Sequence, residues 1–334
     1  MITKPPSGGF FLRGGMLKSS VAQGLIVPIL VVILLSFFLF EATAAELYRY
    51  QDANGQWVFG DKKSLSNHSK GIKPAVEKII INDNRSKKAK PELIYIKEIA
   101  EDNATTWQLT NPLPVPIQHW LSVKEGKRFF TSVLAQPLES LSISPKDYQL
   151  SDSIKVEHFY LLGEPIKRPQ ISVIPPPYSK NKRFLISQGF NGRFTHTGQG
   201  NRYALDIAMP IGEKVLAVKA GVIADARDDF SIGGAANYFL DKANHVTVMH
   251  DDGSYAIYAH ILYGSLDVAI GQRVGVGQVL ARIGSTGYST GPHLHFVMRY
   301  NSGKGVYSIP FKFITAQGAK TPKQGKYYRG VDKK

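Results

Sequence analysis

Apolar residues along most of the chain recur in short runs that are broken by glycine, proline, asparagine and serine, which is the spacing of β-strands and turns. Residues 93–163 carry several such runs and predict a small β-sandwich-like domain. Over residues 181–318 the runs become rich in Gly, Val, Ile and Ala, and segments 212–226 and 271–285 repeat the same glycine and valine punctuation. This repeat predicts a glycine-rich β-sandwich or barrel, so we expect a mainly β protein.

Polar and proline-rich stretches between these runs predict the domain boundaries. Alternating aromatics around an Asn-Gly turn predict a small β-hairpin domain over residues 46–81, followed by a basic linker at 82–92. Five prolines within residues 164–180 predict a stiff linker. The basic end, 319–334, is expected to be a disordered tail, and 226–243 a mobile flap.

The N-terminus is the exception to the short-run pattern. Residues 22–40 form one uninterrupted apolar run, preceded by Lys4, Arg13 and Lys18 and followed by small residues. This order of basic, apolar and small residues predicts that residues 1–45 are a secretory signal peptide, or else an uncleaved membrane anchor. We therefore expect export to the periplasm or cell envelope, with anchoring in the inner membrane as the alternative.

Composition limits the chemistry and the partners. The chain has 334 residues and no cysteine, so any metal site must use His, Asp or Glu ligands. Its formal net charge is +15, which outside the cytoplasm favours anionic envelope polymers or lipid surfaces. No motif for nucleic-acid binding is present, so we expect no nucleic-acid partner, and nothing fixes an oligomeric state.

Two histidines one residue apart, His293 and His295 in "GPHLHF", are the first candidate for chemistry. Side chains alternate along a strand, so both should lie on the same face, about 7 Å apart along the backbone. Such a pair can converge on one metal ion or one reacting group. Spacing alone allows both imidazoles to bind a metal.

Four motifs place further histidines and an aspartate in the same region: D-x-A-x-P-x-G (206–212), G-x-x-x-x-Y-A-H (253–260), V-x-x-G-Q-x-x-A-x-x-G-x-T-G (274–287) and G-P-H-L-H-F (291–296). Together they resemble the lysostaphin-type, or LytM-like, zinc metallopeptidases, which cut peptidoglycan cross-bridges. The resemblance covers most of residues 181–310. It implies the duplicated hybrid motif fold for this domain.

The resemblance also implies roles for single residues. Asp206 and His295 match zinc ligands, and His260 and His293 match two catalytic histidines that are not ligands. The remaining ligand is usually a histidine four residues before the aspartate, but this chain has Arg202 there. A guanidinium has no lone pair to donate to a metal. We therefore expect His196, ten residues before the aspartate, to be the third ligand of one Zn²⁺ ion.

The resemblance implies a zinc-dependent endopeptidase that hydrolyses peptide cross-links of peptidoglycan with a zinc-activated water. The alternative from another class is a catalytically inactive member that binds peptidoglycan or a partner hydrolase and activates it. An alternative ligand set uses both His293 and His295 and leaves His196 out. A lipoyl- or biotin-type carrier domain is disfavoured, because Lys219 lacks the hairpin-tip context that such a domain needs.

Overall fold

The computed structural model describes residues 47–51, 57–60, 77–79, 96–101, 104–123, 128–148 and 156–331. The predicted signal or anchor segment, 1–45, and the predicted basic linker, 82–92, lie outside these residues. Among the residues that the structure describes, no helix is both long and apolar enough to cross a membrane.

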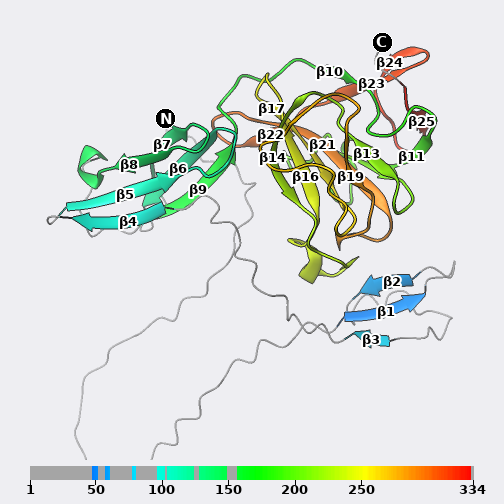
Figure 1. Ribbon diagram of the computed structural model, residues 1–334, viewed down its shortest axis with the longest axis horizontal. Helices are drawn as coiled ribbons and strands as arrows, with labels where there is room; N and C mark the ends of the chain where they lie inside the picture. Colours follow the sequence, from blue (N-terminus) through cyan, green and yellow to red (C-terminus); the bar gives the residue numbers. More distant parts are fainter. Residues whose placement is uncertain are drawn as a thin grey trace, which may run out of the picture.

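A nine-stranded sheet, the main sheet, forms the largest part of the molecule (Figure 1). Its strands follow the order β18-β14-β16-β17-β21-β12-β11-β25, with β22 added to β21. All the pairs within it are antiparallel. The strands are β11 (Arg183–Gln188), β12 (Leu205–Ala208), β14 (Gly221–Arg227), β16 (His245–Met249), β17 (Ser254–Ala259), β18 (Arg273–Val274), β21 (His293–Asn301), β22 (Val306–Ser308) and β25 (Tyr327–Arg329).

Segments 212–226 and 271–285, which share the same spacing of glycine and valine, pair with each other. Strand β13 (Lys214–Leu216) pairs with β19 (Val279–Arg282), and β14 pairs with β18. Each pair joins one segment of the repeat to the other. The β-rich architecture predicted for this region is confirmed.

Three segments differ from the sequence-based predictions. The predicted linker 164–180 is not a free spacer, because β10 (Ser172–Ile174) pairs in parallel with β23 (Phe311–Thr315) and residues 174–178 are buried. The predicted disordered tail is wrong as far as residue 331, because β24 (Gly318–Lys320) pairs with β23 and β25 pairs with β11. The linker prediction rested on proline content and the tail prediction on basic charge. Neither property reports strand pairing, because the partner strands are distant in sequence.

The predicted flap, 226–243, is also packed against the domain. Strand β15 (Gly233–Gly234) pairs with β20 (Gly287–Tyr288), and the short 3₁₀ helix η2 (Asn237–Phe239) follows it. Phe239 is completely buried in a small cluster with Ala236. Burial of this aromatic ring fixes the segment in place.

The core of this region lies on one face of the main sheet. Leu205 and Ile207 of β12 and Leu294 and Phe296 of β21 point into it, together with residues of β10, β13, β19 and β23. Because side chains alternate along a strand, the residues between them face the opposite side. We call this opposite side the open face of the main sheet.

The described residues between 96 and 162 form two three-stranded sheets, which we call the middle domain. Apolar residues of this domain, Leu113, Val115 and Ile117, pack in one cluster with Met249 and Tyr255. Tyr255 alternates along β17 with Ala256 and Tyr258, which belong to the core. Tyr255 therefore lies on the open face. The middle domain therefore covers one end of that face. Its elements are β4 (Ile96–Glu101), β5 (Ala104–Thr110), β6 (Ile117–Val123), β7 (Arg128–Ala135), β8 (Ser140–Ile143), η1 (Pro145–Tyr148) and β9 (Val156–Leu162).

The N-terminal sheet is smaller. Strand β1 (Leu47–Gln51) pairs with β2 (Trp57–Gly60) and with β3 (Glu77–Ile79), both in antiparallel orientation. The pairing of β1 with β2 agrees with the hairpin predicted around the Asn-Gly turn.

A buried polar contact joins the middle domain to the main sheet. The side-chain amide of Asn301, which is fully buried, donates to Gln118 Oε1 at 3.0 Å and to the carbonyl of Gly163 at 2.8 Å. Its own Oδ1 accepts from the backbone N–H of Gly303 at 2.8 Å. Buried polar groups of this kind are costly to leave without a partner.

Replacing Asn301 with alanine should therefore destabilise the protein by about 2–3 kcal/mol, because two buried acceptors and one partly buried N–H would lose their partner. Urea unfolding of the full chain measures this loss. Gln317→Ala, at an exposed position in a turn, should change stability by less than about 0.5 kcal/mol. Equal unfolding midpoints for the two variants would show that the contact does not stabilise the junction.

Candidate metal centre

The candidate residues come from three adjacent strands of the main sheet. Asp206 of β12 lies opposite His295 of β21, and His295 in turn lies opposite Ala259 of β17. His293 pairs with Ala208, two residues along the same ladder. Both histidines of "GPHLHF" thus lie on the open face, as their spacing predicted, and His260 follows directly after β17.

His196 reaches the same place from the loop between β11 and β12. The base of this loop is closed by a hydrogen bond from the backbone N–H of Asn191 to the carbonyl of Arg202, 2.7 Å long. Arg299, on the open face, donates from Nε to the carbonyl of Gly200 at 2.7 Å and so holds the loop against the sheet. The loop buries the His196 side chain completely, while Arg202 is exposed to solvent.

The ligand atoms of His196, Asp206 and His295 all lie within 4.8 Å of one another. Asp206 Oδ1 is 3.2 Å from His196 Nε2 and 2.9 Å from His295 Nδ1. Nε2 of His293 is farther from this oxygen, at 3.9 Å, and His293 is not part of the three-residue cluster. The alternative ligand set that leaves His196 out therefore has the less compact geometry.

The donor set fits zinc. Two imidazoles and one carboxylate are the ligands of a catalytic zinc site with a fourth position left open. Nδ1 of His196 lies 2.9 Å from the carbonyl of Gly189, which can only accept, so this nitrogen carries the proton and Nε2 keeps its lone pair for a metal. A carbonyl that fixes the tautomer in this way is the usual outer partner of a zinc-bound histidine.

Electrostatics keep the carboxylate ionised and His295 neutral. Burial alone would raise the pKa of the Asp206 carboxyl, but its contacts with the imidazoles of His196 and His295 outweigh this effect and hold the pKa well below its ordinary value. Burial lowers the pKa of His295, although the neighbouring Asp206 acts in the opposite direction. These are the protonation states that metal binding requires.

His260 and His293 lie next to each other beside the cluster, with ring centroids 4.4 Å apart. Nδ1 of His260 donates to the carbonyl of Thr286 at 2.6 Å, and Nδ1 of His293 donates to the carbonyl of Gly291 at 2.8 Å. In both rings Nε2 therefore carries the lone pair. Burial lowers the pKa of His260 to about 3, with His293 and His295 adding to the effect, so this ring is neutral at pH 7.

The backbone at His260 is strained. Its φ angle is +67°, in the left-handed region that non-glycine residues rarely adopt. Its carbonyl accepts from the N–H of Gly284 at 2.9 Å, and a Cβ at Gly284 would lie 2.7 Å from Cα of Leu262. Position 284 therefore requires a glycine, because the backbone there lies too close to the backbone at Leu262 for a side chain to fit. Strain of this kind is typical of functional sites.

Gln188 is a residue that the sequence analysis missed. Its amide donates to Asp206 Oδ2 at 2.8 Å and to Thr195 Oγ1 at 2.6 Å. It therefore orients the carboxylate so that Oδ1 faces the two imidazoles, and it links the carboxylate to the loop that carries His196. A glutamine in a strand has no sequence signal for this role, because its partner lies on the neighbouring strand.

Replacing Gln188 with alanine should weaken zinc binding about 10- to 100-fold, which is the usual effect of losing an outer partner of a ligand. Competition with a chromophoric chelator measures the affinity. Ser187→Ala is the matched control, because the Ser187 hydroxyl donates to the backbone carbonyl of Asp206 and not to its carboxylate, so the affinity should stay nearly unchanged. Unchanged affinity in Gln188→Ala would show that Asp206 is held without this contact.

Comparison with known families assigns two parts of the chain. Residues 200–306 match the family model "Peptidase family M23". Residues 34–92 match "Domain of unknown function (DUF4124)". The first match contains Asp206, His260, His293 and His295, while His196 lies just before it.

Similar proteins match the same region. Glycyl-glycine endopeptidase ALE-1 of Staphylococcus capitis is 35% identical over 121 residues, which are 36% of this chain and 30% of that protein. Peptidoglycan DD-endopeptidase ShyA of Vibrio cholerae is 30% identical over 36% of this chain and 26% of its own length. The catalytic domain of lysostaphin from Staphylococcus simulans is 28% identical, with 43% of this chain and 95% of that chain covered and a TM-score of 0.27. The chain thus spans about 30% of the length of ALE-1 and less of ShyA.

Proposed function

We propose, from the premise that residues 200–306 form a domain of peptidase family M23, that this chain is a zinc-dependent endopeptidase that hydrolyses peptide cross-links of peptidoglycan. The observation that carries the proposal is the convergence of His196, Asp206 and His295 on one point of the open face, with His260 and His293 beside it. Relatives named as endopeptidases that act on peptidoglycan support the substrate class.

His196, Asp206 and His295 would hold the zinc ion. When bound, zinc polarises the scissile carbonyl and lowers the pKa of a water molecule to about 7. Gln188 and the carbonyl of Gly189 keep Asp206 and His196 in the orientation that metal binding needs.

His260 and His293 are the two residues that would act on the attacking water. Both present Nε2 lone pairs, so each can accept a hydrogen bond or a proton from the attacking water. The His293 side chain is 17% exposed, so solvent can reach it, and its Nε2 lies 3.9 Å from Oδ1 of Asp206. His260 is more deeply buried, and its low pKa keeps it neutral. We therefore assign proton transfer to His293 and orientation of the water to His260.

The location of the substrate follows from the same proposal. Peptidoglycan lies outside the cytoplasm, and the apolar N-terminal run is suited to export. We propose that the protein acts in the periplasm or at the cell envelope. A formal charge of +15 adds attraction to anionic polymers there.

Metal analysis of the purified full chain, followed by chelation and zinc readdition, tests this function. We expect one zinc per chain, loss of peptidoglycan hydrolysis on chelation and its return with zinc. Hydrolysis that survives complete metal removal would contradict the zinc mechanism. A zinc-loaded chain that leaves peptidoglycan intact but increases the rate of another hydrolase would support the inactive activator instead.

A further inference from the structure

The loop that carries His196 packs on the guanidinium of Arg299. Besides the hydrogen bond from Nε to the carbonyl of Gly200, Nη2 of Arg299 donates to Oδ1 of Asn201. A Cβ at Gly200 would lie 3.7 Å from Nε of Arg299, which places the backbone of the loop directly over the guanidinium. One side chain of β21 therefore fixes two consecutive residues of the loop, only a few positions after the proposed zinc ligand.

Ser308 holds the same loop from the neighbouring strand. Its hydroxyl donates to the carbonyl of Gln199 at 2.8 Å and accepts from the backbone N–H of Tyr203 at 3.1 Å. Arg299 and Ser308 are direct partners in the β21–β22 ladder. The loop is thus held along one row of residues that crosses the main sheet.

The charge of Arg299 is compensated by neutral oxygen atoms. Within the part of the chain that the structure describes, no carboxylate forms an ion pair with it. Burial lowers the pKa of Arg299, so its charged form depends on the hydrogen bonds that it donates. Hydrogen bonds from a charged donor are about twice as strong as those between neutral groups. The loop and the guanidinium therefore hold each other in place.

Tyr255 lies on the other side of Arg299, as its partner in the β17–β21 ladder. The Tyr255 side chain is buried. Burial raises the pKa of its phenol to about 12, and the guanidinium of Arg299 beside it opposes this rise. The row that holds the loop thus continues from β22 through β21 to β17.

The middle domain packs on this end of the row. Leu113, Val115 and Ile117 share one buried cluster with Tyr255, and Tyr160 of β9 lies close enough to the Tyr255 phenol to raise its pKa. Contacts therefore run without interruption from the middle domain through Tyr255 and Arg299 to the loop that carries His196.

We propose that Arg299 is a positioning residue through which the docked middle domain sets the zinc affinity of the metal centre. The middle domain holds Tyr255, Tyr255 limits the positions open to Arg299, and Arg299 places the loop that presents Nε2 of His196. This inference rests on the proposed function, because it takes His196 to be a zinc ligand. Coupling of this kind is reciprocal, so zinc in turn stabilises the docked arrangement.

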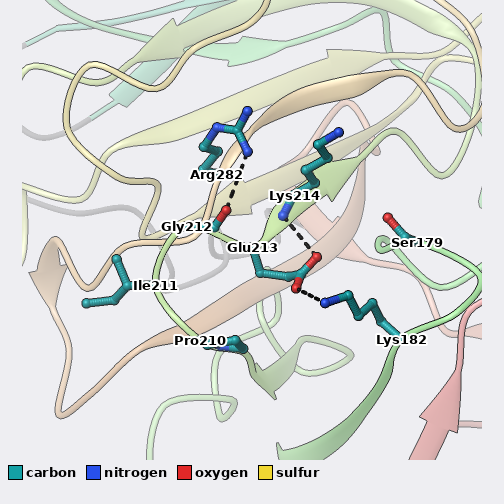
Figure 2. Close-up of a pocket in the computed structure, with 8 residues that line it drawn as sticks. All are labelled: Ser179, Lys182, Pro210, Ile211, Gly212, Glu213, Lys214 and Arg282. Carbon is teal, nitrogen blue, oxygen red and sulfur yellow. Dashed lines mark hydrogen bonds and ion pairs between the residues drawn. The ribbon is translucent and has the colours of Figure 1, made fainter.

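Competition with a chromophoric chelator measures the zinc affinity of the full chain. Arg299→Gln should weaken it about 10- to 100-fold, the usual effect of losing an outer partner of a ligand. Asn201→Ala removes one contact from the loop side and should give a smaller loss. Arg282→Gln is the matched control, because Arg282 also donates to a glycine carbonyl, that of Gly212 at 3.5 Å (Figure 2). Arg282 alternates with the core residue Ala281 and lines a hollow outside the metal centre, so this variant should bind zinc as the parent chain does.

The contribution of the middle domain is tested from its own side of the junction. Leu113→Ala opens a cavity in the cluster that contains Tyr255 and should weaken zinc binding about fivefold, the lower end of typical coupling between sites. Leu109→Ala opens a cavity in a separate cluster inside the middle domain. It should destabilise the fold but leave the zinc affinity unchanged. In the Arg299→Gln background, Leu113→Ala should weaken zinc binding no further.

Equal zinc affinities of Arg299→Gln and Arg282→Gln would overturn the positioning role. Unchanged affinity in Leu113→Ala, or a fivefold loss that persists in the Arg299→Gln background, would overturn the coupling to the middle domain. If Arg299→Gln does not fold, Arg299→Lys replaces it, since lysine keeps the charge but has one nitrogen in place of the two that contact the loop. No substrate is needed, so these outcomes are independent of hydrolysis, and zinc retained in His196→Ala would instead contradict the proposed ligand set.

Discussion

His196→Ala should leave the protein without bound zinc and without measurable hydrolysis of peptidoglycan. His196 supplies one of three protein ligands, and its Nε2 lies 3.2 Å from the carboxylate oxygen that it would share the metal with. A catalytic zinc site uses three protein ligands and leaves its fourth position open. The two ligands that remain in this variant are too few to hold the ion. Metal analysis after purification without chelator measures the loss.

The matched control is His250→Ala. His250 is also buried and its Nδ1 also donates to a backbone carbonyl, that of Ala220 at 2.8 Å, but it lies outside the metal centre. Its variant should retain one zinc per chain. If His196→Ala also retains zinc, then His196 is not a ligand, and His293 must complete the site.

His293→Ala should show the opposite combination, with zinc retained and hydrolysis reduced about 10²- to 10⁴-fold, the usual contribution of a general base. The reason is that Nε2 of His293 faces the metal centre from outside the three-residue cluster. Zinc content and the rate of peptide release, measured on the same preparation, separate the two effects.

His245→Ala serves as the control for this variant. His245 pairs with Asp225, with 2.7 Å between Nε2 and Oδ2, and has no contact with the metal centre. It should retain both zinc and hydrolysis. Loss of zinc in His293→Ala would support the ligand set in which both histidines of "GPHLHF" bind the metal.

Local alternation was enough to predict part of this site. His293 and His295 are separated by Leu294, which is completely buried, so the pair had to face the other side of the strand. The glycine and valine repeat likewise predicted strands, and its two copies pair with each other. Both features depend on residues that are close in sequence or on a pattern repeated within the chain.

Features that depend on distant partners could not be predicted in this way. The position of His196 depends on a loop closed by Asn191 and Arg202 and held by Arg299, which lies about a hundred residues further along the chain. The role of Gln188 depends on the strand beside it. The C-terminal segment looked like a basic tail, but the Tyr328 hydroxyl accepts from the N–H of Lys323 and donates to the carbonyl of Thr321, and the ring packs edge-on against Phe313.

The middle domain is packed tightly against the main sheet. Its apolar residues share a core cluster with the main sheet, and Asn301 adds a buried hydrogen bond to Gln118. Removing the middle domain would expose the apolar side chains of Met249 and Tyr255 to water. Experiments on the metal centre are therefore designed for the full chain.

Mass spectrometry of purified peptidoglycan after digestion by the zinc-loaded full chain tests the central claim most directly. The account predicts soluble fragments in which cross-link peptides carry a new amino group and a new carboxylate, and it predicts none with His293→Ala. Peptidoglycan that remains fully cross-linked after treatment with a chain that holds one zinc ion would contradict it.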